Sequence, residues 1–162
     1  MANYNASNAE ALYDKYADTL YRIALSHTQC NEDAMDVVQD VFLKFFSSET
    51  NITNEEHCKA WFIRATINRS HDVTRRRKIR SYISLEQINE IPAEDDISPD
   101  VREMLNILPE KLKSVMVLHY LEGFSVEETA NVLNISLSAV KTRLNRAREF
   151  VKLKYNKEAF YE

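Results

Sequence analysis

One stretch near the end of the chain carries side chains that could hydrogen bond to nucleic acid. Lys and Arg can contact guanine acceptors or phosphates, Asn can pair with adenine, and Thr can hydrogen bond or touch a thymine methyl group. The free N–H groups of a first helical turn suit a phosphate. The candidate side chains are Ser136, Ser138, Lys141, Thr142, Arg143, Asn145 and Arg146, with Arg148 beside them.

The local sequence predicts the elements that would position these side chains. Ser125 and Glu128 have the spacing of a capping box, which opens a short helix that ends near Leu133. Asn134 suits a left-handed turn, and Ser136 would cap a final helix from 137 to about 154. A short helix, a tight turn and a longer helix form a helix-turn-helix, whose second helix enters the major groove. This pattern favours DNA binding over a hairpin with a basic solvent face.

The helix-turn-helix is preceded by a further predicted helix over 109–122. Pro109 fits its first turn, and Gly123 fits the left-handed position after its end. Residues 84–100 are acidic, hold two of the three prolines and lack a sustained period, so we expect a linker there, with a short helix over about 99–107.

Three amphipathic helices are predicted in the first half of the chain, over 8–29, over 31–46 with Asn31 as N-cap, and over 54–80 with Asn54 at its start. Residues 47–54 are a polar loop. The predicted fold is therefore all-α, with a helical domain over 1–83, a linker over 84–100 and a helix-turn-helix domain over 101–162. The apolar positions expected to face the first core are Leu12, Tyr16, Leu20, Ile23, Ala24, Ala34, Val38, Val41, Phe42, Phe45, Ala60, Phe62, Ile63, Ile67 and Val73.

A second basic block occupies the third helix. Trp61 and Phe62 are followed by polar and basic residues up to Arg80. Aromatic and cationic side chains along one helix could bind phosphates and unstacked bases. The alternative is that the aromatic rings belong to the core and that the run Arg75, Arg76 and Arg77 ends a helix favourably.

Composition and charge exclude several classes of protein. The formal charge of −4 is segregated, with −5 over 1–50, +5 over 51–83, −7 over 84–110 and +3 over 111–162. The single glycine excludes phosphate-binding loops rich in Gly. No apolar run is long enough to span a membrane, and the first residues do not resemble a secretion signal, so we expect a cytoplasmic protein. Cys30 and Cys58 are expected to be thiols.

Taken together, these blocks resemble bacterial sigma factors of the minimal, extracytoplasmic-function (ECF) type. Residues 32–46, residues 60–69 with the basic tail that follows, and residues 108–148 carry the resemblance. It implies two helical domains, one for core RNA polymerase and the minus-ten promoter element and one for the minus-35 element. The implied partners are core RNA polymerase, promoter DNA and an anti-sigma factor, and the free protein would be a monomer without cofactor, enzymatic activity or membrane insertion.

The resemblance also assigns roles to residues. Asp36, Gln39, Asp40 and Lys44 would face the coiled coil of the polymerase β′ subunit, whereas a solvated helix face is the plainer reading. Asn68 would help to hold a base taken from the stack. The implied minus-ten residues are Trp61, Arg64, Asn68, Asp72, Arg75, Arg76 and Arg77, and the minus-35 residues are the set from Ser136 to Arg146 given above. Ser138 stands where the family often has Gly, and Asn145 occupies a position that varies.

Two alternatives remain at this point. A stand-alone helix-turn-helix regulator would be a dimer on a palindromic site. A metal protein could use His27, Cys30, His57 and Cys58, although their spacing matches no usual zinc pattern. For catalysis, His71 beside Asp72 and the isolated His119 form no nucleophile–base set.

Overall fold

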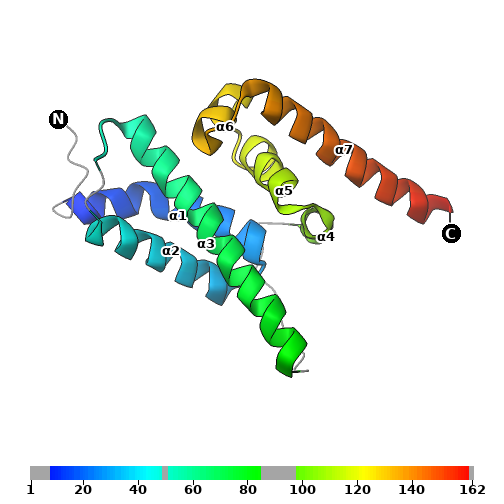
Figure 1. Ribbon diagram of the computed structural model, residues 1–162, viewed down its shortest axis with the longest axis horizontal. Helices are drawn as coiled ribbons and strands as arrows, with labels where there is room; N and C mark the ends of the chain where they lie inside the picture. Colours follow the sequence, from blue (N-terminus) through cyan, green and yellow to red (C-terminus); the bar gives the residue numbers. More distant parts are fainter. Residues whose placement is uncertain (1–7, 49–50, 85–97, 161–162) are drawn as a thin grey trace. The chain divides into compact units, whose positions relative to one another are not determined.

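The structure is a computed structural model that describes residues 8–48, 51–84 and 98–160. Within these ranges every regular element is a helix, as expected from the sequence (Figure 1). The chain divides into two compact units, Met1–Asp96 and Ile97–Glu162. Most of the expected linker, residues 85–97, lies outside the described residues.

The first unit is a bundle of three helices, α1 (Ala9–Thr28), α2 (Asn31–Ser47) and α3 (Glu55–Ser84), each packed on the other two. The predicted core positions are buried except Ala60 and Val73, which are partly exposed. Val37, Cys58 and Thr66 join the core as well. Each helix buries one stripe, as expected for amphipathic helices around a shared core.

Aromatic rings fill the centre of this unit. Phe62 of α3 is fully buried, and its ring centroid lies 4.6 Å from that of Phe45, 4.9 Å from that of Phe42 and 5.3 Å from that of Tyr16. Such tilted ring pairs contribute about 0.5–1.5 kcal/mol each beyond the burial of their area. They fix how α1 and α2 pack on α3.

The ends of these helices agree with the sequence at one cap and differ at another. Asn54 caps α3, because its side-chain oxygen accepts a hydrogen bond from the backbone N–H of His57 (2.8 Å). The prediction that Asn31 caps α2 is wrong. Cys30 occupies the cap position without a side-chain bond, and Asn31 Oδ1 instead accepts a hydrogen bond from the Tyr21 hydroxyl (2.6 Å). The hydrogen bond with Tyr21 thus replaces the capping bond that the sequence predicts for the Asn31 side chain.

Helix α3 extends to Ser84, four residues beyond its predicted end, and its last turns project past α1 and α2 (Figure 1). Its buried face carries a ladder of hydroxyls. Thr66 donates to the carbonyl of Phe62 (2.8 Å), Ser70 to that of Thr66 (2.7 Å) and Thr74 to that of Ser70 (2.8 Å). These bonds satisfy polar groups that would otherwise be costly to bury.

The second unit contains α4 (Pro99–Ile107), α5 (Glu110–Met116), a π-helical turn labelled η2 (Val117–Leu121), α6 (Val126–Leu133) and α7 (Leu137–Phe160). Pro109 precedes α5 as its N-cap residue, rather than lying in its first turn as predicted. Helix α7 continues six residues past its expected end. The largest departure is η2, because a continuous α-helix was expected over 109–122.

The connections around α6 follow the sequence closely. Ser125 and Glu128 form the predicted capping box, and Asn134 has the predicted left-handed conformation at φ 54°. Ser136 Oγ accepts from the backbone N–H of Ala139 (3.1 Å), which caps α7. The carbonyl of Ala130 accepts from the N–H of Ile135 (3.1 Å), which closes the turn. Helices α6 and α7 pack together, so the predicted helix-turn-helix is present.

Gly123 gives a prediction about the second unit. Its φ is +74°, and a Cβ added there would meet nothing within 4 Å, so only backbone strain opposes a side chain. Gly123→Ala should lower the unfolding free energy by roughly 1–2 kcal/mol. Gly123→Asn should lower it less, because Asn tolerates the left-handed region. Urea unfolding followed by circular dichroism measures both losses.

The single tryptophan offers an internal control for this experiment. Trp61 lies in the first unit, so its fluorescence reports on that unit alone. The fluorescence transition should stay unchanged while the helical signal of the second unit shifts. Equal stability of Gly123→Ala and the parent protein would contradict the conformational argument.

Candidate nucleic-acid and protein interfaces

Helix α7 separates its side chains into an inner and an outer face. Val140, Leu144 and Ala147 are buried. Arg143 is partly exposed, and the remaining candidates on the helix are exposed. These exposed residues are Ser138, Lys141, Thr142, Asn145 and Arg146. The outer face therefore presents two cations and three short polar side chains, a set that suits base edges and phosphates.

Hydrogen bonds already engage some of these candidates. Ser136 is exposed, but its hydroxyl caps the helix and lies 3.2 Å from the hydroxyl of Ser138. Asn145 Oδ1 accepts from Nη1 of Arg148 (2.9 Å). Arg148 also donates through Nε to the hydroxyl of Tyr120 (2.7 Å). No pattern in the sequence predicts that Tyr120 lies beside the candidate face.

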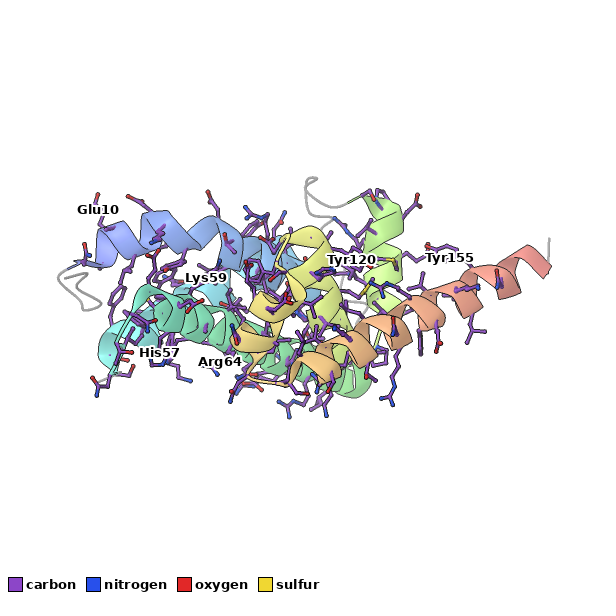
Figure 2. The ribbon with its side chains drawn as sticks, turned by 90° about the horizontal axis from the view of Figure 1, so that it is seen from above. Glu10, His57, Lys59, Arg64, Tyr120 and Tyr155 are labelled. Atoms are coloured by element: carbon purple, nitrogen blue, oxygen red, sulfur yellow. The ribbon has the colours of Figure 1, made fainter. Side chains whose placement is uncertain are left out.

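The candidates on α3 follow one stripe of the helix at spacings of three and four residues. Asn68 is exposed, and Arg64 (labelled in Figure 2) and Asp72 are partly exposed. Trp61 lies at the margin of the core, where its ring makes an edge contact with Phe45 at 5.2 Å between centroids. Trp61 also packs edge-on against the neighbouring Phe62 ring. Both of these ring contacts are with core residues, so Trp61 helps to build the core.

The three consecutive arginines differ from one another. Arg75 is exposed and forms an ion pair with Asp72 one turn earlier, and Arg76 is exposed. Arg77 points back to the bundle, where it pairs with Asp33 in the first turn of α2 (3.3 Å), and its side chain is only 19% exposed. Arg75 and Arg76 are therefore more accessible to a ligand than Arg77.

A groove of about 410 Å³ lies between α2 and α3. It brings Asp40 and Lys44, expected to face polymerase, together with Asn68 and Asp72, expected to face the minus-ten element. Arg69 reaches across it, with Nη2 2.8 Å and Nε 2.9 Å from Oδ2 of Asp40. Asp40 is thus a bridge between two helices as well as a candidate contact.

A second groove, of about 740 Å³, lies between α1 and α2. Asp36 and Gln39 line it, so the four predicted polymerase contacts divide between two faces of α2. Three exposed apolar side chains also line this groove, Tyr13 at 52%, Met35 at 64% and Leu43 at 62% exposure. Sequence reasoning missed them, although Met35 and Leu43 share the i, i+4, i+8 spacing of the exposed Gln39.

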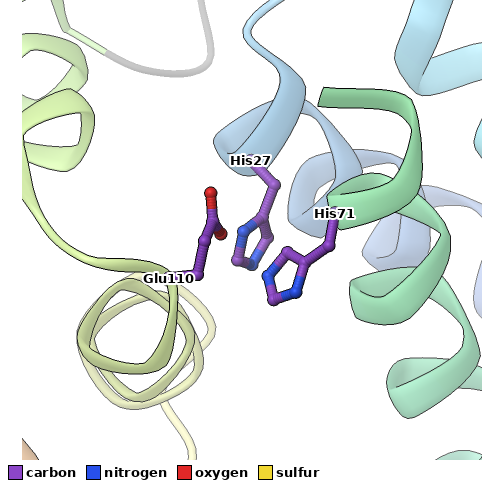
Figure 3. A group of neighbouring side chains, drawn as sticks. All are labelled: His27, His71 and Glu110. Carbon is purple, nitrogen blue, oxygen red and sulfur yellow. The ribbon is translucent and has the colours of Figure 1, made fainter. Parts of the chain in front are cut away.

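Among the residues that the structure describes, the four candidate metal ligands His27, Cys30, His57 and Cys58 do not form a common cluster. The ring of His27 from α1 lies edge-on to that of His71 from α3, with centroids 5.2 Å apart (Figure 3). Cys30 and Cys58 are buried free thiols. Burial raises the pKa of the Cys58 thiol, although a hydrogen bond with Tyr16 and the charge of Lys15 oppose this shift. Cys58 is therefore a core residue whose burial disfavours the thiolate form.

These features define an all-α protein with a helical bundle and a separate helix-turn-helix that presents a basic, polar outer face. Among the described residues, none of the helices is long and apolar enough to cross a bilayer. The family model of sigma-70 region 2 matches residues 12–80, and the family model of sigma-70 region 4 matches residues 99–151.

Curated relatives point to the same family. RNA polymerase sigma factor SigV of Bacillus subtilis is 29% identical over 141 residues, which cover 85% of each chain. ECF RNA polymerase sigma factor SigM of the same organism is 27% identical over 158 residues, which cover 91% of this chain and 95% of the relative. The chain belongs to the ECF sigma factors of the sigma-70 family, and it acts in promoter recognition and transcription initiation.

Solved structures support the fold. Sigma factor RpoE of Bartonella quintana, crystallised with the anti-sigma factor NepR, has a TM-score of 0.64 at 24% identity and covers 88% of this chain and 93% of its own. CnrH, solved in complex with the cytosolic domain of CnrY, gives a TM-score of 0.64 at 23% identity, covering 92% and 88%. The region 2 match over the first unit also sets aside the stand-alone regulator, which has no need of that region.

The Asp40–Arg69 pair yields a prediction about stability. Both side chains are partly exposed, at 43% and 31%, so the pair should contribute no more than about 1 kcal/mol. Asp40→Asn and Arg69→Gln should each destabilise the first unit by about 0.5–1 kcal/mol, and the double variant should lose less than the sum. Denaturant unfolding followed by Trp61 fluorescence measures all three.

Asp36→Asn is the matched control for this cycle. Asp36 is exposed on the same helix and lines the other groove, so its substitution should leave the unfolding midpoint in place. A loss for Asp36→Asn as large as that for Asp40→Asn would mean that the ion pair is not the cause.

Proposed function

We propose that the chain divides promoter-directed initiation among three surfaces. The α1/α2 groove binds core RNA polymerase, the α2/α3 groove with the exposed part of α3 binds the minus-ten element, and the outer face of α7 reads the minus-35 element. The observation that supports this division is the sorting of exposed side chains. Acidic and apolar groups line the α1/α2 groove, cations and an amide beside two carboxylates line the α2/α3 groove, and cations with short polar groups form the outer face of α7.

The proposed polymerase surface combines Asp36 and Gln39 with the apolar side chains of Tyr13, Met35 and Leu43. Exposed apolar groups in a groove rimmed by polar residues are typical of protein interfaces. The occupant is the coiled coil of the β′ subunit, as the family resemblance implies. Asp40 and Lys44, on the adjoining side of α2, lie at the margin of this interface and contribute to it.

The proposed minus-ten surface joins the α2/α3 groove to the stripe on α3. A groove of about 410 Å³ with an amide, carboxylates and cations at its walls can hydrogen bond to the edge of an extruded base. Asn68 is the residue proposed to hold that base, and Arg64, Arg75 and Arg76 would follow the phosphates beside it. Asp72 positions Arg75 through their ion pair. Trp61 and Arg77 support this surface from the core side.

The proposed minus-35 surface is the outer face of α7, entering the major groove by its N-terminal end. Ser136 and the free N–H groups of the first turn would meet a phosphate, while Arg143 supplies charge at the margin. The base edges would be contacted by the exposed residues Ser138, Lys141, Thr142, Asn145 and Arg146. Recognition of this kind needs no dimer, so the free protein is proposed to be a monomer.

The protein is proposed to act in the cytoplasm, where it meets core polymerase. We further propose that an anti-sigma factor binds and inhibits it, since sigma factor RpoE of Bartonella quintana was crystallised with an anti-sigma factor. The net charge of −4 opposes binding of the free protein to DNA. Polymerase would cover the acidic α1/α2 groove and so remove part of that repulsion.

Reconstitution with bacterial core polymerase tests the proposal. The holoenzyme should give specific run-off transcripts from a promoter library, and the free protein should bind the same promoters far more weakly. Asp36→Ala combined with Gln39→Ala should weaken polymerase binding by ten-fold or more, because the groove loses its polar anchors. Fluorescence titration of polymerase measures this affinity.

Glu127→Ala combined with Glu149→Ala is the control variant for polymerase binding. It removes two exposed acidic side chains from the other unit, so polymerase affinity should not fall. A protein that ignores core polymerase altogether would refute the proposed function, and so would an Asp36/Gln39 variant that binds as tightly as the parent.

A further inference from the structure

A short network in the second unit connects the π-helical turn to the proposed base-reading face. Arg148 Nε donates to the hydroxyl of Tyr120 (2.7 Å), and its guanidinium carbon lies 5.5 Å from the centroid of the same ring. Arg148 Nη1 donates to Oδ1 of Asn145 (2.9 Å). One cation therefore holds two side chains, one from η2 and one from the outer face of α7.

The position of Tyr120 depends on the unexpected π-helical turn. A π-turn contains an additional residue, which rotates the side chains after it by roughly 100° relative to a continuous α-helix. The neighbouring His119 holds the turn in place, because its Nδ1 lies 2.7 Å from the carbonyl oxygen of Phe124. The rings of His119 and Tyr120 also meet edge-on at 4.9 Å. Gly123, with its positive φ, lets the chain return to make these contacts.

The chemistry of arginine decides the orientation of the Asn145 amide. A guanidinium has five N–H donors and no acceptor, so only the amide oxygen of Asn145 can face it. The amide nitrogen must then point away from Arg148, which lies one turn further along α7. The two amide N–H groups on the outer face of α7 can therefore donate to a base edge.

We propose that Tyr120 and Arg148 are positioning residues that fix Asn145 as a hydrogen-bond donor to the minus-35 element. This inference rests on the proposed function of α7. In the major groove the available acceptors are O6 and N7 of guanine, O4 of thymine and N7 of adenine. A fixed donor favours guanine or thymine at the contacted position, since the bidentate contact to adenine also needs the amide oxygen.

Selection from a promoter library randomised over the minus-35 element tests this proposal with holoenzyme. Asn145→Ala should reduce the preference at one base pair by on the order of ten-fold. Tyr120→Phe, which removes one hydroxyl from a half-exposed ring, should weaken the preference at that same base pair by three-fold or more. Arg148→Lys, which keeps the charge but lacks the planar fork, should do the same.

Tyr155→Phe is the matched control. Tyr155 is another exposed tyrosine, at 44%, and it lies on α7 outside the network (Figure 2). Its substitution should leave base preference unchanged. Circular dichroism of Tyr120→Phe should match the parent protein, so that a change in preference cannot be ascribed to unfolding.

Three results would overturn the proposal, and they are distinguishable. If Asn145→Ala changes the preference but neither Tyr120→Phe nor Arg148→Lys does, then α7 reads DNA without the network. If Arg148→Lys weakens binding equally on all sequences and lowers the salt dependence, then Arg148 contacts a phosphate instead. If the parent holoenzyme shows no minus-35 preference, then the proposed function of α7 fails together with the inference.

Discussion

Phe62 lies at the centre of the first unit, where its ring contacts Tyr16 from α1 and both Phe42 and Phe45 from α2. Because interiors are close-packed, these contacts leave each helix only one rotation about its axis. The rotation of each helix determines which of its side chains are exposed on the surface. On α2 it places Gln39 in the groove with α1 and Asp40 in the groove with α3. The separation of the proposed polymerase surface from the proposed minus-ten surface is thus a consequence of how one aromatic core packs.

The second unit depends on a backbone feature instead of a large side chain. The π-helical turn, stabilised by His119 and by the positive φ of Gly123, sets where the chain leaves α5 and begins α6. Helix α6 then fixes α7 through the turn at Asn134. A change in η2 would therefore reach the outer face of α7 by two routes, through the packing of α6 and through the contact of Tyr120 with Arg148.

Local chemistry made much of this structure predictable. The caps at Asn54, Ser125 and Ser136 and the left-handed turn at Asn134 involve residues that lie within three positions of their partners, so spacing reveals them. The π-helical turn could not be foreseen, since it depends on contacts from His119 to a carbonyl five residues away. Likewise, the sequence predicts Asn31 as a cap, whereas in the structure its side chain accepts a hydrogen bond from Tyr21 of another helix. The contacts of Arg69 and Tyr120 could not be predicted for the same reason, because these residues meet their partners only through tertiary packing.

The size of the two units bears on how specificity can arise. Each buries only a small core, so each can present only a small reading surface, and a few contacts to bases supply a few kcal/mol of discrimination. Joining the two surfaces in one chain makes the second contact intramolecular once the first has formed. The gain requires that both surfaces reach their elements at once, which the proposed binding to polymerase would allow. A negatively charged chain with two local cationic faces suits the proposed arrangement, in which either face alone would retain DNA weakly and both together on polymerase would retain it more strongly.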